Sequence, residues 1–154
     1  MTTLASPPNW GRLIGQGLIA GIVGGALMNV FMVVAQHASI VNFWQFVASS
    51  AVGQVAYSST NYAWLGLLFH AIVSIAWATG YAYVAATRPN VMATPWLSGI
   101  VYGAVVWLVM EVVLVFDKLA GPLTTSSISM GLLTVCAFYG IPVALTVRAV
   151  ARRT

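Results

Sequence analysis

"YAWLGLLFHAIVSIAWATGYAYVAA", residues 62–86, decides the fold class of this chain. The run contains no Asp, Glu, Lys or Arg, and it exceeds the ~20 residues that a helix needs to cross a bilayer. Because hydrocarbon offers no water to satisfy the backbone, such a segment must bond to itself as an α-helix. The run therefore predicts a membrane-spanning helix, and it raises the question of why a titratable ring, His70, lies within it.

Three further apolar runs predict three further spans, over residues 13–36, 96–116 and 129–150. Charged residues make up 5% of the chain, whereas a soluble domain carries about a quarter. That deficit, with a mean hydropathy of +0.94, excludes a water-soluble globule. We predict an all-α integral membrane protein in which residues 1–154 form one domain, a four-transmembrane-helix bundle.

The basic residues predict the orientation of the bundle. They lie at or near the ends of predicted spans: Arg12, Arg88, Lys118, Arg148, Arg152 and Arg153. Only Lys118 falls in the loop between the third and fourth spans. Because positively charged loops stay in the cytoplasm, we predict that both termini are cytoplasmic, with five of the six basic residues inside. The positive charge is thus explained by topology, and we expect no nucleic-acid partner.

The segment between the first two spans, residues 37–61, has no charged side chain but is rich in amides, hydroxyls and aromatic rings. We predict an amphipathic helix over residues 42–57 that lies in the outer interface or re-enters the protein. Such a helix is either a surface connector or an outer lid over the space between the spans. In the second case Gln45 and Gln54 are the residues expected to act.

Small residues recur at the spacing of packed membrane helices. The predicted packing faces contain Gly17, Gly21, Gly25, Gly99 and Gly103. Glycines four residues apart share one helix face and let two backbones approach closely. They are expected to pack either within the monomer or along the seam of a dimer.

Four polar residues, one from each span, form a predicted intramembrane layer of Asn29, His70, Glu111 and Thr134. Counting from the outer ends of the spans at ~1.5 Å per residue places all four roughly 8–10 Å below the outer boundary. His70 and Glu111 also share helix faces with glycines and other small residues, which points them into the bundle.

The layer allows two interpretations. A lone carboxylate in hydrocarbon costs at least ~2.5–3.5 kcal/mol on insertion scales, so Glu111 is expected to be neutral or to pair with a cation, such as protonated His70. Together with Asn29, the pair can be a clamp that only orients helices, or it can pass a proton.

Other site chemistries have little support in the sequence. No nucleophile motif accompanies Asp117, and His70 with Glu111 supplies too few ligands for a metal, so we expect neither an enzyme nor a metal site. A haem or pigment on His70, with Met28, Met32 or Met110 as the second ligand, is a third alternative. We otherwise predict no cofactor and expect bound lipid.

Several stretches carry a family resemblance, above all "WLGLLFHAIVSIAWATGYAYVA", "PWLSGIVYGAVVWLVMEVVL" and "YGIPVALTVRA". Their most specific part is the pattern H-x-x-x-S-x-x-x-x-x-G-Y, formed here by His70, Ser74, Gly80 and Tyr81. The chain resembles a broad group of mostly uncharacterised bacterial inner-membrane proteins related to YagU. Relatives of this kind tend to have asparagine and a following proline near Glu111, which this chain lacks. The resemblance implies a multi-pass protein of the bacterial inner membrane.

These observations favour a small non-enzymatic membrane protein, acting as an accessory or structural subunit of a larger membrane complex or as a homo-oligomer. Its partners would be the lipid bilayer and other membrane subunits or further copies of itself. The alternative is a conduit for protons or a small solute, or a pH sensor, in which His70 and Glu111 carry charge.

Overall fold

The computed structural model describes residues 9–35, 37, 39–119 and 121–153, and every regular element in these ranges is helical. Four helical segments are long and apolar enough to cross a membrane. They are α1 (Trp10–Ala35), α3 (Tyr62–Thr87), α5 (Pro95–Phe116) and a composite fourth segment, Thr125–Ala151. By length and composition this is an all-α, multi-pass membrane protein.

The fourth segment contains a change of helix type. It consists of α6 (Thr125–Val135), the π-helical turn η2 (Cys136–Gly140) and α7 (Ile141–Ala151). At the end of η2 the backbone N–H of Ile141 donates to the carbonyl of Cys136, five residues back. Proline lacks an N–H, and its ring crowds the carbonyl four residues earlier. Pro142 therefore disturbs the regular helix, and the disturbance takes the form of a π-helical turn directly before it.

This segment begins at Thr125, four residues before the start predicted from apolar residues alone. Thr124 and Ser127 form a reciprocal cap: the Ser127 N–H donates to Thr124 Oγ1 over 3.1 Å, and the Thr124 N–H donates to Ser127 Oγ over 2.9 Å. These two bonds satisfy backbone donors that the helix leaves unpaired at its N-terminus. The polar residues before the apolar run are therefore part of the helix.

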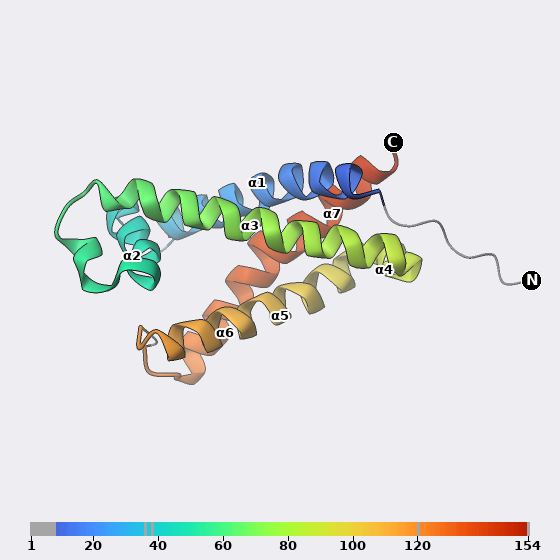
Figure 1. Ribbon diagram of the computed structural model, residues 1–154. Coiled ribbons are helices and arrows are strands. Elements are labelled where there is room, and N and C mark those ends of the chain that lie inside the picture. Colours follow the sequence, from blue (N-terminus) through green and yellow to red (C-terminus); the bar gives the residue numbers. More distant parts are fainter. Residues whose placement is uncertain (1–8, 36, 38, 120, 154) are drawn as a thin grey trace, which may run out of the picture.

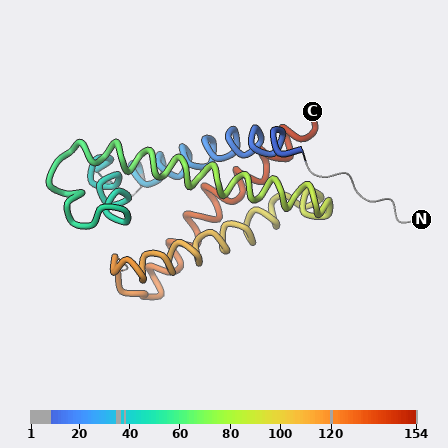
Figure 2. Tube along the Cα trace, viewed as in Figure 1, coloured from blue at the N-terminus to red at the C-terminus, as the bar shows by residue number. Residues whose placement is uncertain are grey.

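The helices form two units that diverge toward one end of the molecule (Figures 1 and 2). In the N-terminal unit α1 runs beside α3, with α2 packed on α3; in the C-terminal unit α5 packs on α6, η2 and α7. The short helix α4 (Pro89–Ala93) joins the units. We call the end near α4 and the C-terminus the termini end, and the opposite end, with α2 and the α5–α6 turn, the far end.

The segment between α1 and α3 contains two helical elements, where one amphipathic helix over residues 42–57 was predicted. Helix α2 (Ile40–Val52) ends at Gly53, and a 3-10 helix, η1 (Gly53–Tyr57), follows. Gly53 has φ = 67°, a backbone conformation that favours glycine, and this is where the chain changes from one helix to the other. Whether α2 lies in a membrane interface stays a prediction.

The predicted glycine faces are packed within the chain. A Cβ atom on Gly21 would lie 2.7 Å from Ile75 Cα of α3, and one on Gly103 would lie 2.7 Å from Cys136 Cα of η2. Gly17 meets the backbone of α3 and Gly99 the start of α7 at the same distance, whereas Gly25 faces side chains of α3, with Ser74 Oγ at 3.0 Å. The glycines therefore hold each helix pair together, so these faces are not available as the seam of a dimer.

Tyrosine hydroxyl groups join the two units. Three bonds do so: Tyr81 with Ser98 Oγ at 2.8 Å, Tyr139 to the Ser74 carbonyl at 2.6 Å, and Tyr102 to the Trp77 carbonyl. Around them lies a core that includes Ala78, Tyr81, Tyr139 and Val143, each at most 3% exposed. The units are thus closely packed through the middle of the bundle and toward the termini end.

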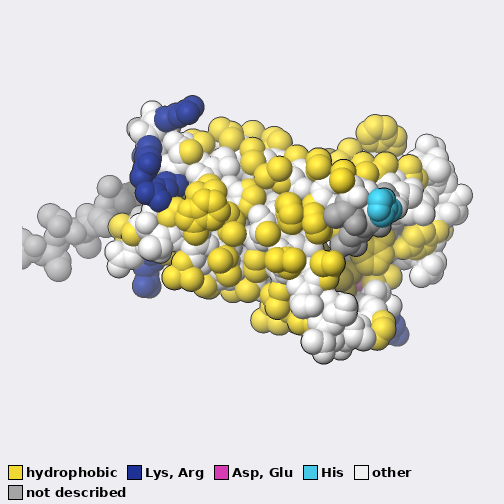
Figure 3. Space-filling view, turned by 180° about the vertical axis from the view of Figure 1, so that it is seen from behind, with side chains coloured by type: hydrophobic (Ala, Val, Ile, Leu, Met, Phe, Trp, Pro, Cys, Tyr) yellow, Lys and Arg dark blue, Asp and Glu magenta, His cyan; other side chains and the backbone are white. Residues whose placement is uncertain are grey.

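The surface matches a bundle immersed in lipid. Hydrophobic side chains cover most of its length, and most of the basic side chains visible in Figure 3 gather at one end. Three tryptophans at the ends of spans are exposed, Trp10, Trp64 and Trp96. Trp77 and Trp107, which lie toward the middle of their spans, are partly buried against the core.

Candidate functional site

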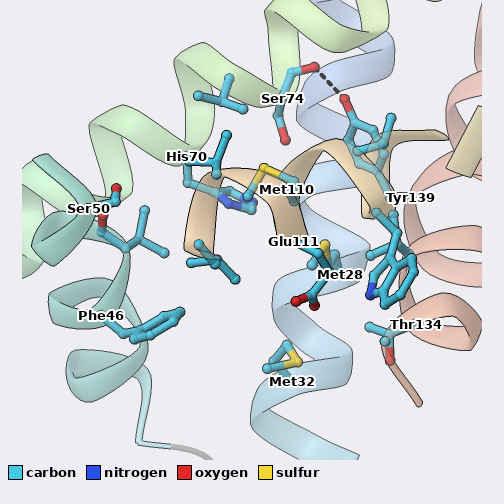
Figure 4. A pocket seen from close by; sticks show the side chains of 18 of the residues that line it. Met28, Met32, Phe46, Ser50, His70, Ser74, Met110, Glu111, Thr134 and Tyr139 are labelled. Atoms are coloured by element: carbon cyan, nitrogen blue, oxygen red, sulfur yellow. Dashed lines mark hydrogen bonds between the residues drawn. The ribbon is translucent and has the colours of Figure 1, made fainter. Parts of the chain in front are cut away.

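A cavity of about 460 Å³ lies where the two units diverge (Figure 4). It is half-open and receives side chains from α1, α2, α3, α5, α6 and η2. Its volume is within the ~300–1,000 Å³ typical of sites for small organic molecules. Because every long segment contributes to the wall, the cavity is a property of the whole bundle.

The wall is mainly apolar and is rich in flexible methionine side chains. Four of the six methionines of the chain contribute to it, Met28, Met32, Met110 and Met130. The aromatic contributors are Phe43, Phe46, Trp77, Trp107 and Tyr139. Methionine is flexible and polarisable and adapts to ligands of different shape. The wall therefore suits a hydrophobic guest.

Glu111 is the one acidic residue of the wall, and no lysine or arginine accompanies it. Its side chain is half-buried and makes no hydrogen bond or ion pair with any described residue. In Figure 4 its carboxylate extends into the pocket from α5, on the side where Met28 and Met32 of α1 lie. The cavity thus contains a carboxyl group that has no partner among the described residues.

His70 borders the same cavity but does not pair with Glu111. Its Nε2 atom is buried without a hydrogen-bond partner, and a Cβ atom built on Gly25 would lie 3.5 Å from it. The Trp44 and Phe43 rings flank the imidazole in edge-to-face geometry, at centroid distances of 5.2 and 6.2 Å. Because Nε2 is buried close to α1, it has no open position for an iron atom, and the arrangement does not fit haem ligation through this nitrogen.

The other two residues of the predicted polar layer differ from each other. Thr134 lines the cavity, but its hydroxyl donates to the Met130 carbonyl of its own helix over 2.7 Å. Asn29 is not among the lining residues, and its Oδ1 atom is buried without a partner. His70, Glu111 and Thr134 therefore border one space, and no hydrogen bond joins any two of the four predicted residues.

Helix α2 covers part of the cavity with a different face from the one predicted. It contributes Phe43, Phe46, Val47 and Ser50. Gln45 is buried and donates from Nε2 to the Ser59 carbonyl over 3.0 Å, which ties α2 to the chain before α3. Gln54 is exposed on η1 and does not line the cavity.

The cavity ends inside the bundle. Tyr139 and Ser74 line its inner end, where the Tyr139 hydroxyl bonds to the Ser74 carbonyl (Figure 4). Beyond this bond lies the core around Tyr81 and Val143, each at most 2% exposed. The space therefore does not continue through the core toward the termini end.

The sequence singled out Met28, Met32 and Met110 only as possible haem ligands, and their place together in the wall of a cavity was not predicted. Met28 and Met32 are one helical turn apart and both line the cavity. That spacing was a usable signal, but methionines in a membrane span resemble any other apolar residue. Across residues 9–35, 37, 39–119 and 121–153, no group of three His, Cys, Asp or Glu side chains could hold a metal ion.

Comparison with known proteins places the chain in a family and does not supply an activity. No curated protein and no solved structure matches it. The resemblance to YagU-related proteins stays a prediction. The model of a family of unknown function (DUF6789) matches residues 12–154, and the chain therefore belongs to that family.

Proposed function

We propose that this protein is a non-enzymatic, multi-pass protein of a bacterial inner membrane that binds a small hydrophobic or amphipathic molecule between its two units. The observation that carries the proposal is the half-open, mainly apolar cavity of about 460 Å³. A packed membrane bundle has little reason to leave such a space, because empty volume forfeits the dispersion contacts that hold helices together in lipid. A bound lipid or similar molecule restores those contacts.

The orientation follows from charge and is part of the proposal. Arg12, Arg88 and Arg148 lie near the termini end by the alternation of the helices, as do the two arginines after α7. Placing this end in the cytoplasm satisfies the positive-inside rule. The cavity then lies in the half of the bundle nearer the outer surface, with α2 on that side.

Binding is better supported than conduction. A conduit needs a path between the two ends of the bundle, whereas the pocket stops at Tyr139 and Ser74 above closely packed side chains. Glu111 and His70 border the pocket on one side of that barrier only. A proton or solute would have to cross the core, and the described residues offer no continuous polar path there.

The open side of the cavity favours a second candidate function, an accessory subunit of a larger membrane complex. A helix of a partner could cover the space between the diverging units. This candidate predicts that the protein migrates with a much larger assembly on a native gel after mild solubilisation. Migration of the protein alone, with a hydrophobic molecule still bound, would favour the first candidate.

The binding proposal is tested by filling the cavity. Val73 of α3 lines it and is 39% exposed, so Val73→Trp should occupy part of the space. The matched control is Val30→Trp on α1, which is 60% exposed and does not line the cavity. Native mass spectrometry should find a co-purified hydrophobic molecule on the wild type and on Val30→Trp, and should find less of it on Val73→Trp. Equal retention by all three proteins would overturn the proposal.

A further inference from the structure

We propose that the cavity selects a lipophilic molecule that carries one positive charge, with Glu111 as its counter-charge. The inference rests on the proposed function and adds the class of ligand. The observation that supports it is a contrast: the wall of the cavity is apolar, but it contains one carboxyl group that pairs with no described residue.

The charge balance of the cavity argues for a cation. Its lining contains Glu111 and no lysine or arginine, and the buried Nε2 of His70 is turned to the backbone at Gly25. A carboxylate held among apolar side chains is poorly solvated, and an opposite charge nearby offsets that cost more strongly than in water. A lipophilic cation supplies this charge and also fills the apolar space.

The aromatic and sulfur-containing side chains suit the same ligand. Phe46, Trp77 and Trp107 present rings to the cavity from three different helices. Ring faces attract cations through their quadrupole, and the attraction is greater where water is excluded. Methionine sulfur is polarisable and adapts to bulky groups.

The same features disfavour other ligand classes. A lipophilic anion would meet the charge of Glu111 without any basic side chain in the wall to compensate. A neutral hydrocarbon would fill the space but leave the carboxyl group unpartnered. One acidic residue fits one positive charge, and a volume of about 460 Å³ fits one drug-sized molecule.

The test uses two probes of nearly equal shape and opposite charge, tetraphenylphosphonium and tetraphenylborate, with the neutral tetraphenylmethane as a third. Binding is measured by equilibrium dialysis against protein in lipid nanodiscs, with empty nanodiscs subtracting partition into lipid. Glu111→Gln removes the charge at nearly constant shape. Asp117→Asn is the matched control, because Asp117 is the only other acidic residue and does not line the cavity.

We expect wild type and Asp117→Asn to bind the phosphonium in preference to the borate. Glu111→Gln should weaken phosphonium binding by at least ~10-fold, because it removes one partner of a charge pair that is buried away from water. Binding of the neutral probe should stay unchanged. If the neutral probe binds, and the wild type and Glu111→Gln bind the phosphonium equally well, this inference alone is overturned and the proposed function stands.

Failure of all three probes to bind above empty nanodiscs would overturn the proposed function as well. Should Glu111→Gln fail to fold, the preference of the wild type between the two ions still decides the inference. Binding of the borate as tightly as the phosphonium would then reject it.

Discussion

Single glycines set how closely the spans approach, and their effect depends on which atoms a side chain would meet. A Cβ atom on Gly21 would lie 2.7 Å from Ile75 Cα and 2.9 Å from the Ser74 carbonyl oxygen, both backbone atoms of α3. Backbone cannot move aside as the end of a side chain can, so α1 and α3 must separate. The additional methyl group is therefore expected to destabilise the protein although alanine favours helices.

We predict that Gly21→Ala lowers stability by ~1–3 kcal/mol, the usual cost of overpacking. Gly15→Ala is the matched control, since a Cβ atom there would meet nothing within 4 Å. Alanine at that position should be neutral or stabilise the helix by up to ~1 kcal/mol. Thermal unfolding of the two variants in the same detergent measures the difference. Equal stability of Gly21→Ala and Gly15→Ala would show that the α1–α3 contact is looser than the structure has it.

Residue spacing gave the helix faces that pack, but it gave only part of the site. Glu111, His70 and Thr134 border one cavity. The sequence could bring these three together because the depth of a residue along a span can be counted from the end of the span. Asn29 lies outside that lining, because a count of depth does not fix the direction of a side chain around the helix. The tyrosine bonds between the units could not be predicted, since Tyr139 and Tyr102 donate to backbone carbonyls, which every residue has.

At the scale of elements, the docking of α2 on α3 controls one wall of the cavity. The carbonyl of Trp44 lies where a side chain on Gly66 would begin, so only glycine permits the contact. Gln45 adds one hydrogen bond to Ser59 on the same side. Gly66 therefore sets how closely α2 approaches α3, and the buried residues Trp44, Ala48 and Ser49 of α2 add to the same contact.

Gly66→Leu should release α2 from α3 while leaving the four spans in place. Gly80→Leu on the same helix is the control, because a Cβ atom there would meet nothing within 4 Å. Hydrogen exchange should become faster in α2 (Ile40–Val52) in Gly66→Leu and stay unchanged in Gly80→Leu. Exchange that is equally slow in both variants would contradict this account of how α2 is held.

The elements differ in how far the sequence determines them. The spans follow from length and hydropathy, and the composite fourth segment was predicted apart from its first turn. The π-helical turn at Cys136–Gly140 was not predicted. Pro142 indicates a local disturbance, but the choice between a kink and an added residue in the turn depends on packing. In this fold Gly140 lies against Gly99 of α5.

At the scale of the whole molecule, the divergence of the two units could not be predicted from the sequence. In a soluble helix, polar residues mark the outer face and orient it against its neighbours. In a span, residues facing lipid and residues facing protein are both apolar, as exposed Leu108 and buried Val106 of α5 illustrate. The hydrophobic pattern therefore identifies the spans without arranging them, and the cavity depends on that arrangement.

Orientation in the membrane is the property of the whole molecule that the charges predict most directly. Gly121 lies between α5 and α6 at the far end, and Ala93 lies in α4 at the termini end; both are exposed. Cysteine at each position, in a Cys136→Ala background that removes the native thiol, reports its side of the membrane.

With both termini cytoplasmic, a membrane-impermeant maleimide should label Gly121→Cys in intact spheroplasts and label Ala93→Cys only after permeabilisation. The Cys136→Ala parent should stay unlabelled in both conditions. The reverse labelling would place the arginines outside, against the positive-inside rule, and would turn the cavity toward the cytoplasm, so that its ligand would enter from there.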